Sequence, residues 1–275
     1  MEKNKEHMGG FKLFKSVLGN IFKFYYRPTI IGSENVPEEG PIIVVGNHVH
    51  IMDQCLPIMG IKRPIHYMAK REYFDNKKVA WFFKAAGCIP VDRSIKDTNA
   101  TGKALEVLEA GLALGLFPEG TRNGLKEQRL LEVYELCKDK YPDYKKFKKL
   151  MKKEKASYVN YLVELLDDKK ITKKEFEDGV TNSRAALLNL VSKKVITKKE
   201  FDEVLLLPFK FGAVSMAKKT GALLVPYGIT GDYKFRSKDL TARFGKPIKV
   251  GDDLEEANKK LRNEIARLMR ENLKK

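Results

Sequence analysis

His48 and Asp53, separated by four residues, are the first pair in the chain whose types and spacing could do chemistry. Residues 42–45 are a β-branched run that favours a buried strand, and residues 46–47 favour a turn after it. If the chain winds into a helix beyond His48, the Asp53 carboxylate can return to hydrogen-bonding distance of the imidazole. It would fix the tautomer and stabilise the imidazolium of a general base. The alternative is a helix-capping His48 and a solvated Asp53.

Further charged residues follow other expected strands. Residues 62–71 predict a strand ending near Lys70, residues 87–93 one ending at Arg93, and residues 112–117 one running into Glu119 and Arg122. Residues 222–225 predict a further strand. Helices are expected over residues 77–86 and 98–109, between strands. This alternation predicts an α/β fold with a mostly parallel sheet flanked by helices, in which ligands bind at the carboxyl ends of the strands.

The charge balance points to an anionic partner. Lys and Arg number 53 against 36 Asp and Glu, a net charge of +17, which suits an anionic membrane, a phosphorylated substrate or a nucleic acid. The lysines are spread through helical segments and no zinc-finger or RNA-binding signature occurs, so no nucleic acid is expected. The cysteines, Cys55, Cys88 and Cys137, lack metal-ligand spacing, so they read as reduced thiols and no metal is expected.

Residues 1–26 predict an amphipathic helix. Phe11, Phe22 and neighbouring apolar residues share one side, opposite lysines, as in a helix that lies in a membrane interface. The same pattern also fits a helix that packs on its own core. No run of about eighteen apolar residues and no signal-peptide pattern occurs, so we expect a monotopic, peripheral protein on the cytoplasmic face of a membrane.

Four ordered blocks together resemble the glycerolipid acyltransferase family, the PlsC-type enzymes that acylate 1-acylglycerol 3-phosphate. The blocks are Asn47-His48-x4-Asp53, Gly87-x2-Pro90-Val91-Asp92-Arg93, Phe117-Pro118-Glu119-Gly120-Thr121-Arg122 and Val225-Pro226. The resemblance covers residues 10–124 and 205–250. The third block is the most specific of the four, and its position after a His-x4-Asp pair adds to its weight.

The resemblance implies transfer of a fatty acyl chain from acyl-CoA or acyl carrier protein to the free hydroxyl of a lysophospholipid, with lysophosphatidic acid as first choice. His48 would be the general base and Asp53 would orient it. Since the thioester is already activated, no cofactor is implied. Glycerol 3-phosphate or another lysolipid is the alternative acceptor. The alternative from a different functional class is a non-catalytic membrane adaptor that acts through the insertion described below.

The resemblance also assigns acceptor binding. Arg122 would grip the phosphate, within a loop that includes Gly120 and Thr121. Glu119 would shape that loop or orient the acceptor, unless it only accepts backbone amides. Arg93 and Lys70 are candidate helpers, although Arg93 fits a structural salt bridge equally well. His50 stands where a small polar residue is frequent in the family. Its side chain is either solvated or a second group that contacts the thioester or the acceptor.

Residues 125–204 form an insertion between the two parts of the core, residues 27–124 and residues 205–275, and the latter end in a helix. The insertion contains a repeat at a spacing of 25 residues, in which Thr172-x-x-Glu175 and Thr197-x-x-Glu200 predict capping boxes. Two helical hairpins follow, which resemble SHOCT domains. We expect an all-helical appendage for membrane contact, self-association or binding of a partner protein.

Overall fold

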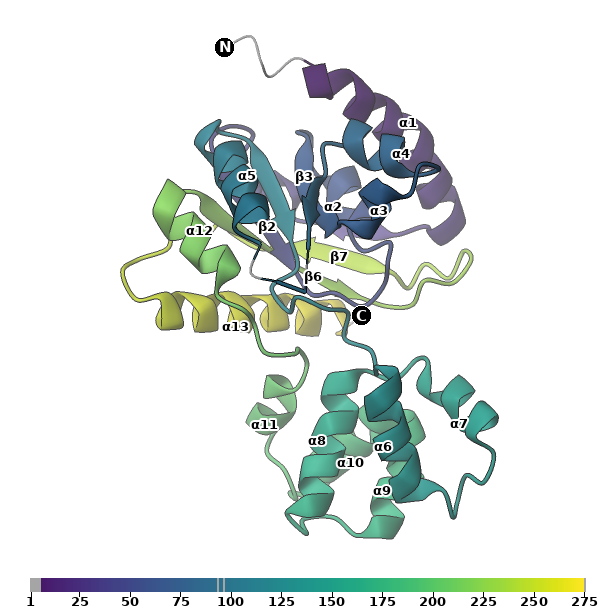
Figure 1. The fold of residues 1–275 in the computed structure, drawn as a ribbon. Helices are drawn as coiled ribbons and strands as arrows, with labels where there is room; N and C mark the ends of the chain where they lie inside the picture. Colours follow the sequence, from purple (N-terminus) through teal and green to yellow (C-terminus); the bar gives the residue numbers. More distant parts are fainter. Residues whose placement is uncertain (1–5, 93, 96, 275) are drawn as a thin grey trace. The chain divides into compact units, whose positions relative to one another are not determined.

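The computed structural model describes residues 6–92, 94–95 and 97–274, apart from the side chains of residues 6–10 and 12–14. Its contacts divide the chain into two units. One unit comprises Met1–Gly120 and Phe209–Lys275, and the other comprises Thr121–Pro208. The first, coloured purple to blue and green to yellow in Figure 1, is the α/β unit, and the second is all-helical.

The α/β unit is built on a seven-stranded sheet in the order β1-β7-β6-β2-β5-β3-β4. The strands are β1 Thr29–Ile31, β2 Ile42–Gly46, β3 Ile65–Lys70, β4 Ile89–Val91, β5 Ala113–Leu116, β6 Leu223–Thr230 and β7 Thr241–Phe244. All neighbours pair in parallel except β6 and β7, which are antiparallel. The mostly parallel α/β prediction is therefore confirmed.

Helices cover both faces of the sheet (Figure 1). On one side lie α1 Glu6–Tyr26, α2 Cys55–Gly60, α3 Glu72–Asp75 and α4 Ala80–Ala85. On the other lie α5 Thr98–Glu109, α12 Gly212–Thr220 and α13 Leu254–Asn272. A single 3-10 turn, η1 Ser33–Asn35, follows β1. Because β2, β5 and β6 are sandwiched between these layers, they are apolar on both faces, as central parallel strands usually are.

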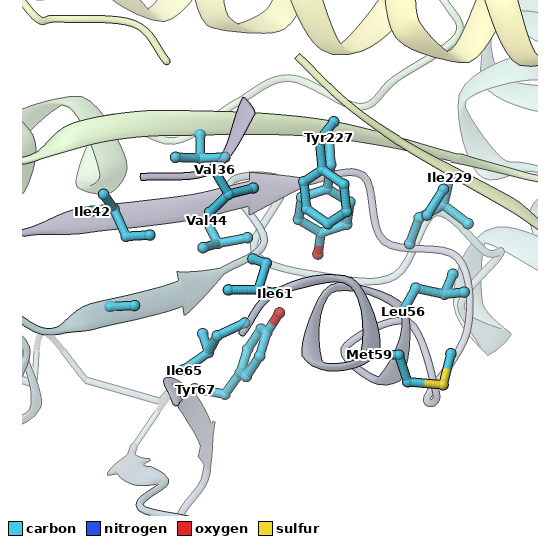
Figure 2. Packing of buried hydrophobic residues seen from close by; sticks show 14 of the residues in the cluster. Val36, Ile42, Val44, Leu56, Met59, Ile61, Ile65, Tyr67, Tyr227 and Ile229 are labelled. Carbon is cyan, nitrogen blue, oxygen red and sulfur yellow. The ribbon is translucent and has the colours of Figure 1, made fainter. Parts of the chain in front are cut away.

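The core under α2 is packed around two tyrosines, Tyr67 of β3 and Tyr227 of β6. Figure 2 shows their hydroxyl groups pointing into the cluster that includes Leu56 of α2. Each ring lies against the backbone of a glycine on a neighbouring strand. A Cβ atom at Gly46 would lie 2.3 Å from the Tyr227 ring, and one at Gly115 would lie 2.5 Å from the Tyr67 ring. Both glycines are therefore required by close packing.

Helix α1 divides its apolar side chains between the core and the surface. Phe11 and Phe22 are buried, and the helix contacts α2 and α4. Other apolar side chains of α1 are exposed, namely Val17, Leu18, Ile21, Phe24 and Tyr25. The interpretation of a helix packed on the core therefore describes one of its faces, and the membrane contact of the other face stays a prediction. No helix among the described residues is long and apolar enough to cross a membrane.

The helical unit consists of α6 Glu127–Cys137, α7 Tyr144–Met151, α8 Ala156–Asp167, α9 Lys173–Gly179, η2 Val180–Asn182, α10 Ser183–Ser192 and α11 Lys198–Glu203. The repeat of 25 residues appears in the backbone itself. Lys169 and Lys194 have positive φ angles of 57° and 59° and end the first helix of each hairpin. The capping boxes at Thr172 and Thr197 both form, so these local predictions are confirmed, whereas the SHOCT resemblance stays a prediction.

Candidate active site

His48 and Asp53 meet in a tight turn beyond the end of β2. The Nδ1 atom of His48 lies 2.8 Å from Oδ2 of Asp53, and the aspartate is fully buried. Oδ2 also accepts the backbone N–H groups of Val49 at 2.6 Å and His50 at 2.8 Å. Asp53 therefore both orients the imidazole and closes the turn that carries it.

The expected helix directly after His48 does not form there. Helix α2 begins only at Cys55, and Gln54 occupies its N-cap position. The turn is stable without a helix because the Asp53 carboxylate satisfies two backbone donors that precede it in the chain. The interpretation of His48 as a helix cap, with a solvated Asp53, is therefore wrong.

The hydrogen bond at Nδ1 leaves the other ring nitrogen of His48 as the site for a proton. When Nδ1–H donates to the carboxylate, the Nε2 atom carries the lone pair. The imidazole is stacked on Phe117, with ring centroids 4.0 Å apart and an interplanar angle of 10°. Its side chain keeps 14% of its surface exposed. A partly accessible imidazole held by a buried carboxylate can serve as a general base.

Glu119 ties the loop after β5 to the turn of residues 48–53, which carries the candidate dyad and is named the catalytic turn. Its Oε1 atom accepts the backbone N–H of His48 at 2.8 Å, and the residue is 4% exposed. The geometry thus gives Glu119 a loop-holding function, and its contact with the acceptor stays a prediction. Gly120 has a φ of +69° and donates its N–H to the Phe117 carbonyl, which closes a sharp turn after Glu119.

Asn47, quoted in the first sequence block, joins the catalytic turn to β6. Its side-chain amide donates to the Ile229 carbonyl at 3.1 Å, and its oxygen accepts the Ile229 N–H at 2.7 Å. The asparagine side chain thereby imitates the pairing of a strand residue one position beyond β2. It fixes the direction in which the chain leaves the sheet, and so the position of His48.

Lys210 is a cation at this site that sequence reasoning did not assign. Its side chain lies over Gly120, and its backbone N–H donates to the Pro118 carbonyl at 2.9 Å. The residue is exposed. It stands in the segment Pro208-Phe209-Lys210, at the point where the chain returns to the α/β unit.

Tyr233, in the loop between β6 and β7, is a second residue that sequence reasoning missed. Its hydroxyl donates to Oδ1 of Asp53 at 2.6 Å, and its ring stacks on His50 at a centroid distance of 4.1 Å. Burial and the charge of Asp53 raise the pKa of Tyr233. His50, half-buried, therefore packs against Tyr233, which the expectation of a solvated side chain did not include.

The remaining predicted residues are placed as follows. Lys70 ends β3 and is exposed, with its Nζ atom 3.7 Å from Glu72. Arg93 lies outside the described residues. Thr121 and Arg122 begin the helical unit, and Arg122 is exposed. The acceptor-binding functions of all four stay predictions.

The cysteines and possible metal ligands offer no further chemistry at this site. Burial raises the pKa of Cys55 to about 12 and that of Cys88 to about 11, so little thiolate exists near neutral pH. Burial likewise raises the pKa of Cys137 to about 12. Within the described residues, no three His, Cys, Asp or Glu side chains are grouped so that they could hold a metal ion.

Comparison with known proteins identifies the class that this fold and site define. The sequence profile of the acyltransferase family matches residues 27–230, more than half of the chain. The chain therefore belongs to the acyltransferase family.

Individual relatives share shorter segments. The chain is 36% identical over 96 residues to a 1-acyl-sn-glycerol-3-phosphate acyltransferase of Borreliella burgdorferi, covering 34% of this chain and 38% of that protein. It is 33% identical over 94 residues to the Bacillus subtilis protein of the same name, covering 34% and 47%. The match thus spans less than half of these curated relatives.

One solved structure has a similar fold over most of its length. It is the 1-acyl-sn-glycerophosphate acyltransferase PlsC of Thermotoga maritima, with a TM-score of 0.55 and 21% sequence identity. The comparison covers 96% of this chain and 87% of that one. At this level of identity the likeness shows the fold alone, and it agrees with the parallel sheet described above.

Proposed function

We propose that the protein transfers a fatty acyl group from a thioester, acyl-CoA or acyl carrier protein, to the free hydroxyl of lysophosphatidic acid and so forms phosphatidic acid. The observation that carries the proposal is the buried Asp53 carboxylate bonded to Nδ1 of a partly exposed His48. The names of the relatives support lysophosphatidic acid as the acceptor. Glycerol 3-phosphate and other lysolipids are the competing acceptors.

The reaction follows from the geometry of the dyad. Nε2 of His48 removes the proton from the acceptor hydroxyl as its oxygen attacks the thioester carbonyl. The Asp53 carboxylate stabilises the imidazolium that results. Collapse of the tetrahedral intermediate breaks the C–S bond, and the imidazolium returns its proton to the departing thiolate. Such general-base assistance typically contributes about 10²- to 10⁴-fold to the rate.

Acceptor binding needs cations near the phosphate. By the family resemblance, Arg122 would bind the phosphate through the two parallel hydrogen bonds that a planar guanidinium can form. Within the α/β unit, Lys210 places a positive charge over Gly120. Lys70, the last residue of β3, would add charge at the carboxyl edge of the sheet. Arg93 stays a candidate helper by the family resemblance alone.

A peripheral position on a membrane surface suits substrates of this kind. The exposed apolar side chains of α1 would enter the lipid interface, and Lys23 of the last turn would face lipid phosphates. We propose that the protein acts on the cytoplasmic face of a membrane without spanning it. The binding of vesicles tests this separately from catalysis.

The decisive experiment is an acyl-transfer assay with purified protein. Radiolabelled acyl-CoA or acyl carrier protein is offered with lysophosphatidic acid, glycerol 3-phosphate or another lysolipid, and products are separated by lipid chromatography. We expect phosphatidic acid to form fastest, and His48→Gln to lower the rate about 10²- to 10⁴-fold. Lys78→Gln, at an exposed position with no proposed function in binding or catalysis, is the control. Acylation of none of these acceptors would refute the proposal.

A further inference from the structure

The Asp53 carboxylate divides its hydrogen bonds unequally between its two oxygens. Oδ2 receives Nδ1 of His48 and two backbone N–H groups, all within 2.8 Å. Oδ1 receives the Tyr233 hydroxyl at 2.6 Å. A carboxylate can rotate about its Cβ–Cγ bond, so a donor at each end fixes the plane in which Oδ2 meets the imidazole.

We propose that Tyr233 is a positioning residue that completes a His48–Asp53–Tyr233 relay, and that the last turn of α1 holds Tyr233 in place. The tyrosine acts on Asp53, through which it sets the orientation of the imidazole. The inference rests on the proposed function only where it predicts an effect of Tyr233 on the reaction rate. The geometric part of the inference concerns the three side chains alone.

Tyr233 reaches the dyad from a loop that is sharply folded. Residues 231–240 connect β6 to β7, and Gly231 begins the loop with a φ of +88°. A Cβ atom at Gly231 would lie 2.2 Å from the Asp239 carbonyl oxygen, so the loop closes on itself at this point. The antiparallel return into β7 then confines Tyr233 to the carboxyl end of β6, where the catalytic turn lies.

The end of α1 forms the other support of this loop. The backbone N–H of Arg236 donates to the Tyr25 carbonyl at 2.7 Å, and the Phe235 ring packs on Tyr25 at a centroid distance of 4.9 Å. The Tyr26 ring packs edge-on against Tyr233 at 5.4 Å. Tyr233 is therefore held between the α1 terminus on one side and His50 on the other.

The hydroxyl of Tyr233 is protonated, as a hydrogen-bond donor to Asp53 must be. Burial, together with the charge of Asp53, raises its pKa, so it stays protonated and donates its hydrogen at the pH of any ordinary assay. A donor of this kind strengthens the carboxylate's preference for one orientation without adding a net charge. The Tyr233 ring, by contrast, contributes packing that a phenylalanine preserves.

The first test reads the imidazole directly and needs no substrate. Protein labelled with ¹⁵N in its four histidines is examined by NMR, and the signals of His48 are assigned by their loss in His48→Gln. In Tyr233→Phe we expect the His48 Nδ1–H resonance to shift or to broaden through faster exchange with water. Tyr26→Phe, a hydroxyl deletion in the same aromatic cluster, should leave that resonance unchanged. An unchanged resonance in Tyr233→Phe would overturn the inference.

The second test is kinetic and separates positioning from binding. We expect Tyr233→Phe to lower kcat about tenfold, the scale of one hydrogen bond to a charged group, with the KM of both substrates nearly unchanged. An equal loss in Tyr26→Phe, or a loss confined to KM, would contradict positioning. If the wild-type protein acylates no acceptor, the proposed function fails, while the NMR comparison still decides on Tyr233.

A third variant checks the support from α1 without touching the relay. Phe235→Ala removes a ring that is 55% exposed and packs on Tyr25, so the protein should remain folded. We expect a smaller change of the His48 Nδ1–H resonance in the same direction as in Tyr233→Phe. A resonance identical to that of the wild type would show that α1 does not hold the loop.

Discussion

At the residue scale, Asp53 carries both structure and chemistry. The same oxygen that meets the imidazole accepts the backbone N–H groups of Val49 and His50, and the aspartate itself is fully buried. A substitution there cannot remove one function and keep the other. His48 differs from Asp53, because its side chain bonds to Asp53 and stacks on Phe117.

We therefore expect Asp53→Asn to lose both activity and stability. The amide has a single acceptor oxygen, so whichever way it turns, either the backbone donors of the turn or the Tyr233 hydroxyl loses its acceptor. A buried donor left unpaired costs about 1–3 kcal/mol. The free energy of unfolding from urea denaturation should fall by at least that amount, and acyl transfer should fall with it. Asp75→Asn, at an exposed position of α3, is the control and should change neither. A variant as stable as the wild type would mean that the turn holds without the carboxylate.

The site was predictable from sequence wherever its residues are close in the chain. His48 and Asp53 are five positions apart, so their types and spacing were sufficient to pair them. Tyr233 lies 180 positions from Asp53, in a loop whose residues repeat no pattern. Only the antiparallel return of β7, a tertiary feature, brings it to the dyad. Contacts made by such returns leave no local trace in a sequence.

At the element scale, α1 shows why an amphipathic pattern alone left two interpretations open. Phe22 and Ile21 are neighbours in the sequence, yet the first is 4% exposed and the second 59%. Aromatic and aliphatic residues occur on more than half of the helix circumference, so the helix can pack on α2 and still present apolar side chains outward. Deleting α1 would therefore remove buried core residues as well as the exposed apolar face.

Point substitutions on the exposed face of α1 are therefore the sharper test. We expect Ile21→Asp with Phe24→Asp to abolish most binding to anionic vesicles, since both side chains are more than half exposed and each charge opposes insertion. Binding is measured by co-sedimentation, and thermal melting checks the fold. Leu131→Asp with Leu188→Asp, exposed apolar residues of the helical unit, is the matched control. Equal loss in the control would move the anchor away from α1.

Regular elements with local signals were predicted closely. Helix α5 has the expected bounds of Thr98–Glu109, because Asp97 caps it and accepts the N–H of Ala100. Strand β6 extends to Thr230, five residues beyond the expected end, since Pro226 stands within the strand and reads as a break. Strand β7 was not expected, because its four residues have a pattern too short to separate from a loop.

At the scale of the whole molecule, the chain leaves the α/β unit after Gly120 and returns at Phe209. The two ends of this interruption are joined within the α/β unit itself, since the N–H of Lys210 donates to the Pro118 carbonyl at 2.9 Å. That backbone bond closes the host fold at the point where the helical unit is attached. The helical unit in turn has its own buried residues, among them Phe147, Phe176 and Leu187.

We therefore expect the α/β unit to fold without the helical unit. In the variant, a short Gly-Ser linker replaces residues 123–207, which removes the buried Leu205 and Leu206 together with their unit and keeps Arg122. Circular dichroism should report a cooperative unfolding transition, and short-chain soluble acceptors should still be acylated. A control variant receives the same linker in the α5–β5 turn, at Gly111. A folded but inactive deletion variant would show that the helical unit completes the site.

The bond between Pro118 and Lys210 also bears on how such a protein arises. A segment whose ends enter and leave between these two residues adds to the gene without changing the spacing of any strand in the sheet. Descendants of one ancestral enzyme can therefore acquire, exchange or lose whole modules at this junction by a single recombination event.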